Sequence, residues 1–436
     1  MKTNRFSLFA LILLVIVFAQ LGNPTLSPVL HSESPTPTGT PSIPAATQTA
    51  TTAPTPTVTP TPQAEYLFNR EVFPSCMTSQ VEDGFRSYSL GAKLDMEIST
   101  SEYEYIICDE REFSDFVMEA DITLVDATPA NVKTTFIFRH ILVEEYEKDL
   151  EFGLTNGLAN LFYYDSSQDD AWTTLIDYTP VPVFNETSSN HLKVMAIGDT
   201  YIFFVNGAFI GQVQDSHLSS GSVGVALTNW ATEQTQHVVY ENLALLDLSA
   251  PKLRYEETDF VSGGCFGEGS GDGYETFAEN EQYHVNLTAG TYFVVPCQGA
   301  GLDALTDFIL EMDVTPETSG YPGLAFRTNT DTGTMYIFQI SPDGSAYLSY
   351  LPTYNDTPVT LVDWVPTGAA FPVGESVHLR IIAIGDSILI YANGYLAAQV
   401  QDASISSGGI TLVANAQETD ANFIFDNLKV INLVAP

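Results

Sequence analysis

The sequence predicts an all-β protein in which two antiparallel β-sandwich domains follow one another along the chain. Three observations support this prediction. A 25-residue segment, 191–215, recurs as 378–402 with 12 identical positions at an offset of 187. Short runs of alternating apolar and polar residues fill both halves, and no convincing helical period interrupts them. Each half also holds one cysteine pair with the same spacing of 32 residues.

The first 64 residues belong to neither half. Lys2 and Arg5 precede the apolar run 6–18, a pattern typical of a signal peptide, which we place at residues 1–22. The run is short for a membrane span, and an uncleaved N-terminal anchor stays the alternative. Residues 23–64 are rich in Pro, Thr and Ala, and they cannot pack as a core because proline fixes φ and lacks a donor. We expect a disordered stalk, or a tail with no spacing role.

The charge is strongly negative. The chain has 15 Lys and Arg against 54 Asp and Glu, a net charge of −39. Nucleic acid is excluded as a partner, because neutralising its phosphates requires a basic surface. Anionic membranes and acidic polysaccharides are disfavoured for the same reason, unless a cation such as Ca²⁺ bridges the two. Solubility of a secreted protein is the simplest interpretation of this charge.

The two copies, residues 65–249 and 253–436, predict the same order of strands. Each opens with a Cys-containing segment rich in Gly and acidic residues. A core strand follows, 115–122 or 307–314, in which apolar side chains alternate with acidic ones. Several further strands precede the repeated segment, and two follow it. The expected strands of copy one are 135–139, 151–154, 161–164, 174–178, 219–225 and 238–243, and those of copy two are 323–327, 336–340, 347–350, 360–364, 406–412 and 423–428.

The repeated segment predicts three consecutive antiparallel strands joined by two tight turns. Asn206-Gly207 lies between two runs of β-branched and aromatic residues, and Asn393-Gly394 is its counterpart. This pair is a strong hairpin signal, because a type I′ turn needs a positive φ at both central residues. Gly198-Asp199 and Gly385-Asp386 mark the turn one strand earlier.

The four cysteines predict two disulfides. Four cysteines allow three connectivities, and the repeat favours Cys76–Cys108 and Cys265–Cys297. Export makes disulfides the expected state, and closing a loop of this length stabilises a domain by about 3–4 kcal/mol. A metal site with four thiolates is the alternative, although the two pairs lie far apart along the chain.

The order of motifs, E-x-D, F-R, I-G-D, N-G, S-G and [FY]-[DE]-N-L, resembles the concanavalin A-like lectin and glucanase superfamily. Within it, the chain looks most like laminin-G-like domains of the 3-keto-disaccharide hydrolase type and related glycan modules of unassigned function. The resemblance covers roughly residues 110–248 and 303–434. It implies a jelly-roll sandwich of two sheets, with a concave face that meets sugar in many relatives.

Two kinds of side chain are candidates for ligand binding. Acidic residues and an arginine are expected to point away from the phenylalanines onto one open face, where they could hydrogen-bond sugar hydroxyls; a cross-strand charge ladder is the alternative. Aromatic residues could stack on sugar rings or belong to the core. The candidates are Glu119, Asp121, Arg139, Tyr164 and Trp172 in copy one and Glu311, Asp313, Arg327, Tyr347 and Trp364 in copy two.

A catalytic motif is incomplete in both copies. Glucanases of this superfamily use a second Glu four or five residues after the Glu of Glu-x-Asp, and a retaining mechanism needs both carboxylates. The chain has Thr123 and Leu124 there in copy one, and Thr315 and Pro316 in copy two. The sequence therefore predicts no catalytic residue.

A metal or cofactor has little support. Asp165, Asp169 and Asp170 form a weak candidate cluster for Ca²⁺, without the spacing of an EF-hand, and solvated loop acids are the alternative. No other cofactor is predicted.

The predicted function is non-catalytic binding of an extracellular polysaccharide or glycoconjugate by a secreted or cell-surface protein, tethered to the envelope if its N-terminal segment is kept as an anchor. A glycoside-processing hydrolase of the 3-keto-disaccharide type, with Glu119 or Glu311 as general acid/base, is one alternative. A structural surface protein that binds other proteins is the other.

Overall fold

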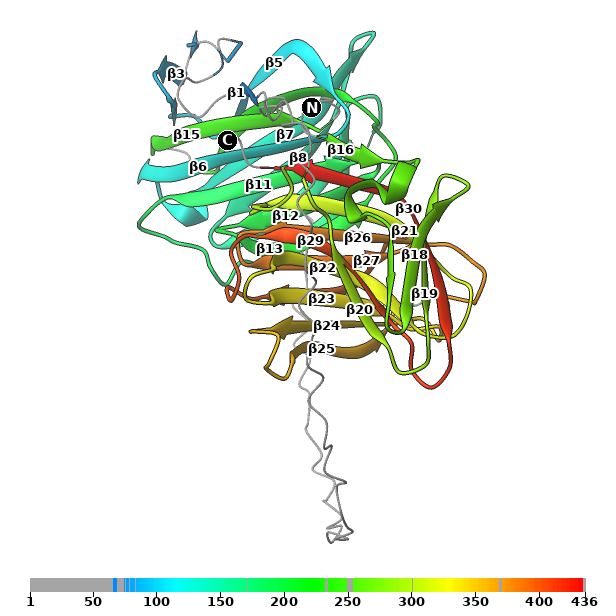
Figure 1. Ribbon diagram of the computed structural model, residues 1–436. Coiled ribbons are helices and arrows are strands. Elements are labelled where there is room, and N and C mark those ends of the chain that lie inside the picture. Colours follow the sequence, from blue (N-terminus) through cyan, green and yellow to red (C-terminus); the bar gives the residue numbers. More distant parts are fainter. Residues whose placement is uncertain are drawn as a thin grey trace, which may run out of the picture. The chain divides into compact units, whose positions relative to one another are not determined.

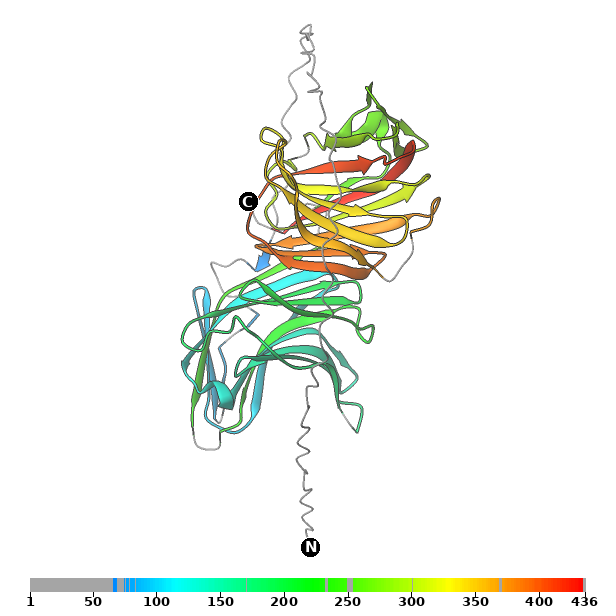
Figure 2. The same ribbon diagram turned by 90° about the horizontal axis from the view of Figure 1, so that it is seen from below.

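The computed structural model describes residues 66–68, 74, 76–77, 79–82, 84–169, 171–231, 234–248, 254–299, 301–367 and 371–433. The predicted signal segment and stalk lie outside these ranges. Within the ranges, no helix is both long and apolar enough to cross a membrane. The described residues form four antiparallel sheets, two in each copy, with two short 3-10 helices, η1 (Pro129–Asn131) and η3 (Val261–Phe266). Figures 1 and 2 show the strands.

Copy one contains a nine-stranded and a six-stranded sheet, which we call sheet A and sheet B. Sheet A has the order β13-β12-β11-β6-β15-β4-β3-β2, with β1 also paired to β15, and sheet B has the order β10-β9-β8-β7-β14-β5. The strands of sheet A are β1 (Tyr66–Phe68), β2 (Val81–Glu82), β3 (Phe85–Leu90), β4 (Lys93–Ile98), β6 (Phe116–Asp126), β11 (Asn190–Ile197), β12 (Thr200–Val205), β13 (Ala208–Gln214) and β15 (Gln236–Asp247). Those of sheet B are β5 (Tyr103–Phe113), β7 (Val132–Val143), β8 (Tyr146–Thr155), β9 (Leu158–Asp165), β10 (Trp172–Pro180) and β14 (Gly221–Asn229).

Copy two repeats this arrangement in sheets C and D. Sheet C has the order β17-β18-β19-β30-β21-β26-β27-β28, with β16 also paired to β30, and sheet D has the order β20-β29-β22-β23-β24-β25. The strands of sheet C are β16 (Arg254–Glu257), β17 (Gly269–Gly271), β18 (Tyr274–Glu279), β19 (Gln282–Leu287), β21 (Phe308–Pro316), β26 (Val377–Ile384), β27 (Ser387–Ala392), β28 (Tyr395–Gln401) and β30 (Ala421–Asn432). Those of sheet D are β20 (Tyr292–Pro296), β22 (Tyr321–Asn329), β23 (Thr334–Ile340), β24 (Ser345–Leu351), β25 (Val359–Pro366) and β29 (Gly409–Asn415).

The core of each copy lies between its two sheets. Phe116 of sheet A meets Phe138 of sheet B edge to face, with ring centroids 6.1 Å apart, and Phe308 meets Phe326 at the same distance in copy two. Both pairs belong to larger clusters of buried apolar residues. The predicted all-β sandwich fold is therefore confirmed. A further cluster draws buried residues from both copies, including Phe204 of β12 and Leu389 of β27.

The repeated segment forms the predicted strands β11–β13 and β26–β28. At its second turn, Asn206 and Gly207 have φ values of 50° and 76°, and Asn393 and Gly394 have 49° and 80°. These positive values are what a type I′ turn requires. The Asn206 side chain also accepts a hydrogen bond from the His191 backbone N–H, so the turn is tied to the start of its own hairpin.

Both predicted disulfides are present. Cys76 is bonded to Cys108 with a Cα–Cα distance of 5.0 Å, and Cys265 is bonded to Cys297 with a Cα–Cα distance of 4.7 Å. In copy one, the disulfide links the segment before β2 to β5, the edge strand of sheet B.

Replacing Cys76 and Cys108 together with serine should lower the free energy of unfolding of copy one by about 3–4 kcal/mol, because the unfolded chain gains loop entropy. Urea unfolding measures this, and the equivalent change at Cys265 and Cys297 is the matched comparison. An unchanged unfolding midpoint in both variants would contradict the stabilising role.

Candidate functional site

The acidic pair of the first core strand belongs to a charge network on the outer face of sheet A. Asp121 lies 2.8 Å from His191 Nδ1 and accepts a hydrogen bond from the Asn242 side chain. Glu119 lies 2.9 Å from Lys193 Nζ, and its side chain is almost fully buried. Burial alone would lower the pKa of His191, but hydrogen bonds to Asp121 and Glu119 raise it above its ordinary value.

Copy two builds the same network in sheet C. Asp313 lies 2.7 Å from His378 Nδ1 and accepts a hydrogen bond from Asn427, while Glu311 lies 2.6 Å from Arg380 Nε. Lys429 Nζ is 3.1 Å from the other Glu311 oxygen. Burial opposes the charge of both carboxylates, yet their cationic and hydrogen-bonding partners hold both pKa values below the ordinary range. Ligand binding by these four carboxylates stays a prediction.

The two arginines predicted to share this open face do not do so. Arg139 and Arg327 are each only 1% exposed, so the expectation that they face outward beside the acidic pairs is wrong. The physical reason is local. Each arginine has a left-handed φ, 52° or 48°, next to a shift in strand register, and this breaks the alternation on which the prediction was based.

Each guanidinium instead binds backbone carbonyls at one end of its sandwich. Arg139 donates to the carbonyl oxygens of Ser114, Gly198 and Leu218. Arg327 does the same in copy two, with N···O distances of 2.7 Å to Thr306, 2.8 Å to Gly385 and 2.9 Å to Ile405.

A glycine is required beside each arginine. A Cβ on Gly221 or Gly408 would lie 2.3 Å from the carbonyl carbon of Arg139 or Arg327. The Ser-Ser-Gly motif and the Phe-Arg motif, far apart in sequence, are therefore two parts of one structural feature.

The aromatic candidates of copy one gather on the outward face of sheet B. Trp172 of β10 lies across from Tyr164 of β9, with ring centroids 4.6 Å apart. Phe162 makes edge contacts with Trp172 and with Tyr178, at 5.9 and 6.1 Å. Trp172 and Tyr178 are 44% and 43% exposed, so the four rings form a partly open row, which we call the copy-one platform. The structure thus brings Tyr164 and Trp172 together, and places them away from Glu119.

Sheet D carries a comparable row in copy two. The Trp364 ring lies 5.2 Å from Tyr347, in a stacked arrangement, and 5.1 Å from Tyr321. Trp364 is 39% exposed. We call the rings of Tyr321, Tyr347 and Trp364 the copy-two platform. Tyr292 of β20, the opposite edge strand of sheet D, is 48% exposed. Burial, with a contribution from Tyr347, raises the pKa of its hydroxyl to about 12.

Three carboxylates beside the copy-one platform were not among the predicted residues. Glu147, Asp149 and Glu151 alternate along β8, so they project from one face of the strand. Asp149 is paired in register with Tyr164, and Glu151 with Phe162. The alternation Glu-Lys-Asp-Leu-Glu is a visible signal for them, although it lies outside the Glu-x-Asp motif of the first core strand.

Tyrosine, lysine and histidine side chains contact these carboxylates. Tyr103 and Tyr105 of β5 donate hydrogen bonds to Glu151 (2.5 Å) and Glu147 (2.8 Å). Lys133 Nζ lies 3.4 Å from Glu151, and His140 Nδ1 lies 3.2 Å from Asp149. Lys133 can reach Glu151 because β8 has glycine at Gly153, where a Cβ would lie 2.1 Å from Lys133 Cε.

Several buried polar atoms near this cluster have no hydrogen-bond partner. Among the described residues these are Asp149 Oδ1, Thr135 Oγ1 and both side-chain heteroatoms of Asn160, with Arg139 Nε as the other case. Thr135 and Asn160 flank Gly153 in register, two residues along from the Glu151 and Phe162 pair. Buried polar groups in proteins are nearly always satisfied. These atoms lie together in sheet B, beside the three carboxylates of β8.

Burial is the largest influence on the pKa values of this cluster. Burial raises the pKa of Asp149, with a further contribution from Glu147, although His140 opposes this. Burial also raises the pKa of Glu151, with Lys133 opposing and Asp149 adding to the shift. The pKa of Lys133 is lowered by burial despite its contact with Glu151. The cations present do not fully compensate the buried negative charge.

The candidate calcium residues are divided between described and undescribed parts of the chain. Asp165 lies 3.0 Å from Lys148 Nζ, and the Ser167 hydroxyl donates to it; together these lower its pKa to about 2. Asp169 is exposed, and Asp170 lies outside the described residues. The described residues contain no group of three or more side chains suited to a metal ion. Calcium binding there stays a prediction.

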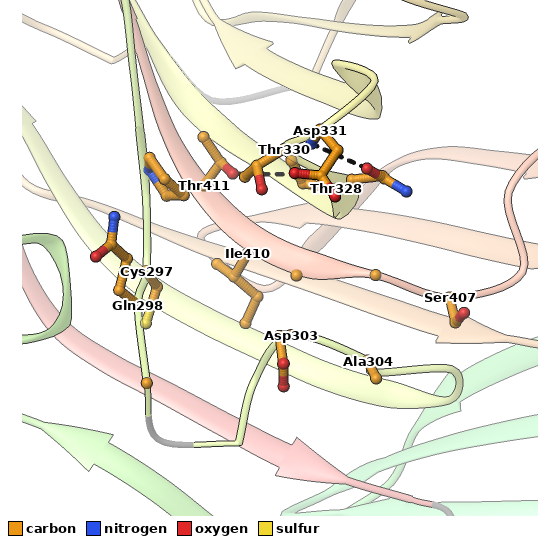
Figure 3. Close-up of a pocket in the computed structure, with 15 residues that line it drawn as sticks. Cys297, Gln298, Asp303, Ala304, Thr328, Thr330, Asp331, Ser407, Ile410 and Thr411 are labelled. Carbon is orange, nitrogen blue, oxygen red and sulfur yellow. Dashed lines mark hydrogen bonds between the residues drawn. The ribbon is translucent and has the colours of Figure 1, made fainter. Parts of the chain in front are cut away.

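A separate cavity of about 560 Å³ opens beside sheet D. Figure 3 shows Gln298 and Asp303 on one side of it and Thr330 and Asp331 on the other. Its lining residues include no aromatic ring. It therefore lacks the stacking surface found on the two platforms.

Replacing Arg139 with methionine should lower the free energy of unfolding by at least about 2 kcal/mol, since three buried carbonyl groups lose a charged donor. Chemical denaturation measures this, with the exposed Arg111→Met as control, expected within about 0.5 kcal/mol of wild type. Equal effects of the two changes would contradict the structural role of Arg139.

The network around Asp313 should make the protein sensitive to acid. Because the folded pKa values of Glu311 and Asp313 lie below their ordinary values, the stability they contribute is present above the ordinary pKa and is lost as pH falls through the folded pKa. Asp313→Asn should therefore reduce the loss of stability between about pH 5 and pH 2. Urea midpoints measured across this range test it, with exposed Glu375→Gln as control; an acid slope equal to wild type would be the contrary result.

No protein-family model matches the chain, and no curated protein matches it significantly. Solved structures do match. The chain is similar to the carbohydrate-binding module CBM66 from Bacillus subtilis (18% identity, 35% of this chain and 86% of that chain, TM-score 0.29). It is also similar to a Bacillus subtilis protein of unknown function with a galectin-like fold (14%, 42% and 97%, TM-score 0.34) and to the galectin LEC-6 of Caenorhabditis elegans (15%, 33% and 92%, TM-score 0.23). At these TM-scores, none of the likenesses supports a functional assignment.

Proposed function

We propose that the protein binds carbohydrate, without cleaving it, on the outward faces of its two six-stranded sheets. The observation that carries this proposal is the row of partly exposed rings on each sheet, the copy-one and the copy-two platform. The C–H face of a sugar ring stacks on an indole or phenol ring, and polar groups around it fix the orientation of the sugar.

Both platforms supply polar groups beside the rings. The copy-one platform adjoins the carboxylates of β8 and the amide of Asn160. The copy-two platform adjoins Gln339, which is paired in register with Tyr347, and Thr360, whose hydroxyl lies 3.2 Å from the Tyr347 hydroxyl. An arrangement of rings flanked by hydrogen-bonding side chains suits a polyhydroxylated ligand better than a purely apolar one.

The two copies would act as a bivalent binder. We propose that residues 65–249 and 253–436 are two domains, each with one weak glycan site. A polymer that reaches both sites would bind about 10²–10⁴ times more tightly than to either alone. The two disulfides fit an oxidising compartment, and we propose a secreted or cell-surface location.

The test is binding to a glycan array followed by calorimetry on the full chain. Trp172→Ala and Trp364→Ala should each weaken binding to a polymeric glycan about tenfold or more, because each removes the central ring of one platform. Trp230→Ala is the matched control, since Trp230 is equally exposed, at 45%, but belongs to neither platform.

Two results would contradict the proposal. One is the absence of any glycan ligand at millimolar concentration. The other is a release of reducing ends from a bound glycan, which would show that the protein cleaves what it binds.

A further inference from the structure

The two platforms differ in charge, although they occupy equivalent strands. The two copies can be aligned on the phenylalanine that precedes each buried arginine. Phe138 of β7 is paired with Leu150 of β8, and Phe326 of β22 is paired with Tyr336 of β23. The neighbours of Leu150 are Asp149 and Glu151. The neighbours of Tyr336 are Met335 and Ile337, which are buried in a small apolar cluster on the outward side of sheet D. Copy one therefore has two carboxylates where copy two has two apolar side chains.

The copy-one cluster has more negative than positive charge. Three carboxylates, those of Glu147, Asp149 and Glu151, face one ammonium, that of Lys133, with His140 beside Asp149. The other lysine of β8, Lys148, is paired with Asp165 instead. An oxygen of the buried Asp149 has no hydrogen-bond partner. A ligand that brings one positive charge would improve this balance, whereas a neutral ligand would not.

The rings favour a cation as well. Trp and Tyr faces attract cations through the ring quadrupole, and Trp does so most strongly. Asp149, Tyr164 and Trp172 form one row across β8, β9 and β10. Since neighbouring strands are about 4.8 Å apart, this row spans about 10 Å. That length fits a sugar ring stacked on Trp172 with a substituent that reaches the carboxylates.

We propose that the copy-one platform selects glycans bearing protonated amines, and that the copy-two platform binds uncharged glycans; this rests on the proposed function. The ligand class for copy one is an amino sugar with a free amine. The ligand class for copy two is a neutral polysaccharide. The chain would thereby recognise polymers that contain both kinds of unit, such as a partly deacetylated amino-sugar polymer.

The experiment compares three hexasaccharides on the full chain by calorimetry, in 150 mM salt at a pH where the sugar amine is protonated. They are a glucosamine hexamer, its N-acetylated form and cellohexaose. We expect the free amine to bind at least about tenfold more tightly than the N-acetylated form, as a charge-assisted contact would give. Glu147→Gln should remove most of this preference, because Glu147 is the most exposed of the three carboxylates.

Controls separate this site from the general negative charge. Glu82→Gln removes the same charge from an exposed position on sheet A, and it should not change the preference. Glu147 is only half-buried, so its substitution should leave the melting temperature unchanged. Asp149→Asn changes the buried carboxylate of the same cluster, and it should also reduce the preference for the free amine. Trp364→Ala should weaken cellohexaose binding and leave the preference for the amine intact.

Several outcomes would overturn the inference. They are equal affinity for the three hexamers, an unchanged preference in Glu147→Gln and Asp149→Asn, or equal effects of Glu82→Gln and Glu147→Gln. Hexalysine binding as tightly as the glucosamine hexamer would also overturn it, because the site would then recognise positive charge and not the sugar. If cellohexaose still binds and Trp364→Ala still weakens it, the proposed function stands while this inference fails. If no hexamer binds, both fail.

Discussion

A buried guanidinium at one end of each sandwich is the constraint on which the rest of the fold depends. Arg139 holds the carbonyl oxygens that follow three separate strands, and Arg327 repeats the arrangement. Each arginine has a left-handed φ at a register shift within its strand, and the neighbouring strand passes so closely that only glycine fits. A charged group buried in this way is stable only while all its partners are present. The two sheets of a copy are thus fixed relative to each other at this end by one side chain.

The motifs that the two copies share are explained by such structural needs. The acidic pair of the first core strand binds a histidine and a cation on the adjacent strand, and the asparagine of the last strand binds the same aspartate in both copies. The features that distinguish the two platforms are those that the copies do not share. Copy one has carboxylates on β8, and copy two has Met335 and Ile337 at the same places. Duplication preserved the scaffold, while the outward faces of the six-stranded sheets diverged.

Much of the fold could be predicted because its signals are local. Asn-Gly turns, alternating strands and equal cysteine spacing each depend on residues close in sequence, and the hairpins and both disulfides are present as expected. The orientation of Arg139 could not be predicted by the same rule, because one left-handed residue reverses the alternation. Of the site, Tyr164, Trp172, Tyr347 and Trp364 were named from the sequence, but their ring contacts could not be predicted, since a loop separates the two residues of each pair. The cluster on β8 depends on Tyr103, which lies 48 residues from Glu151, and no local pattern connects the two.

Because the chain has only three tryptophans, one spectrum can test where a glycan binds. The measurement is a titration of isotope-labelled full-length protein with a glycan that binds it, following the three indole N–H signals by NMR. We expect the signal of Trp172, that of Trp364 or both to shift on binding, while that of Trp230, which is as exposed as Trp172, stays in place. A shift of the Trp230 signal alone, or bound glycan with no shift at Trp172 and Trp364, would contradict the assignment of the binding faces to the two six-stranded sheets.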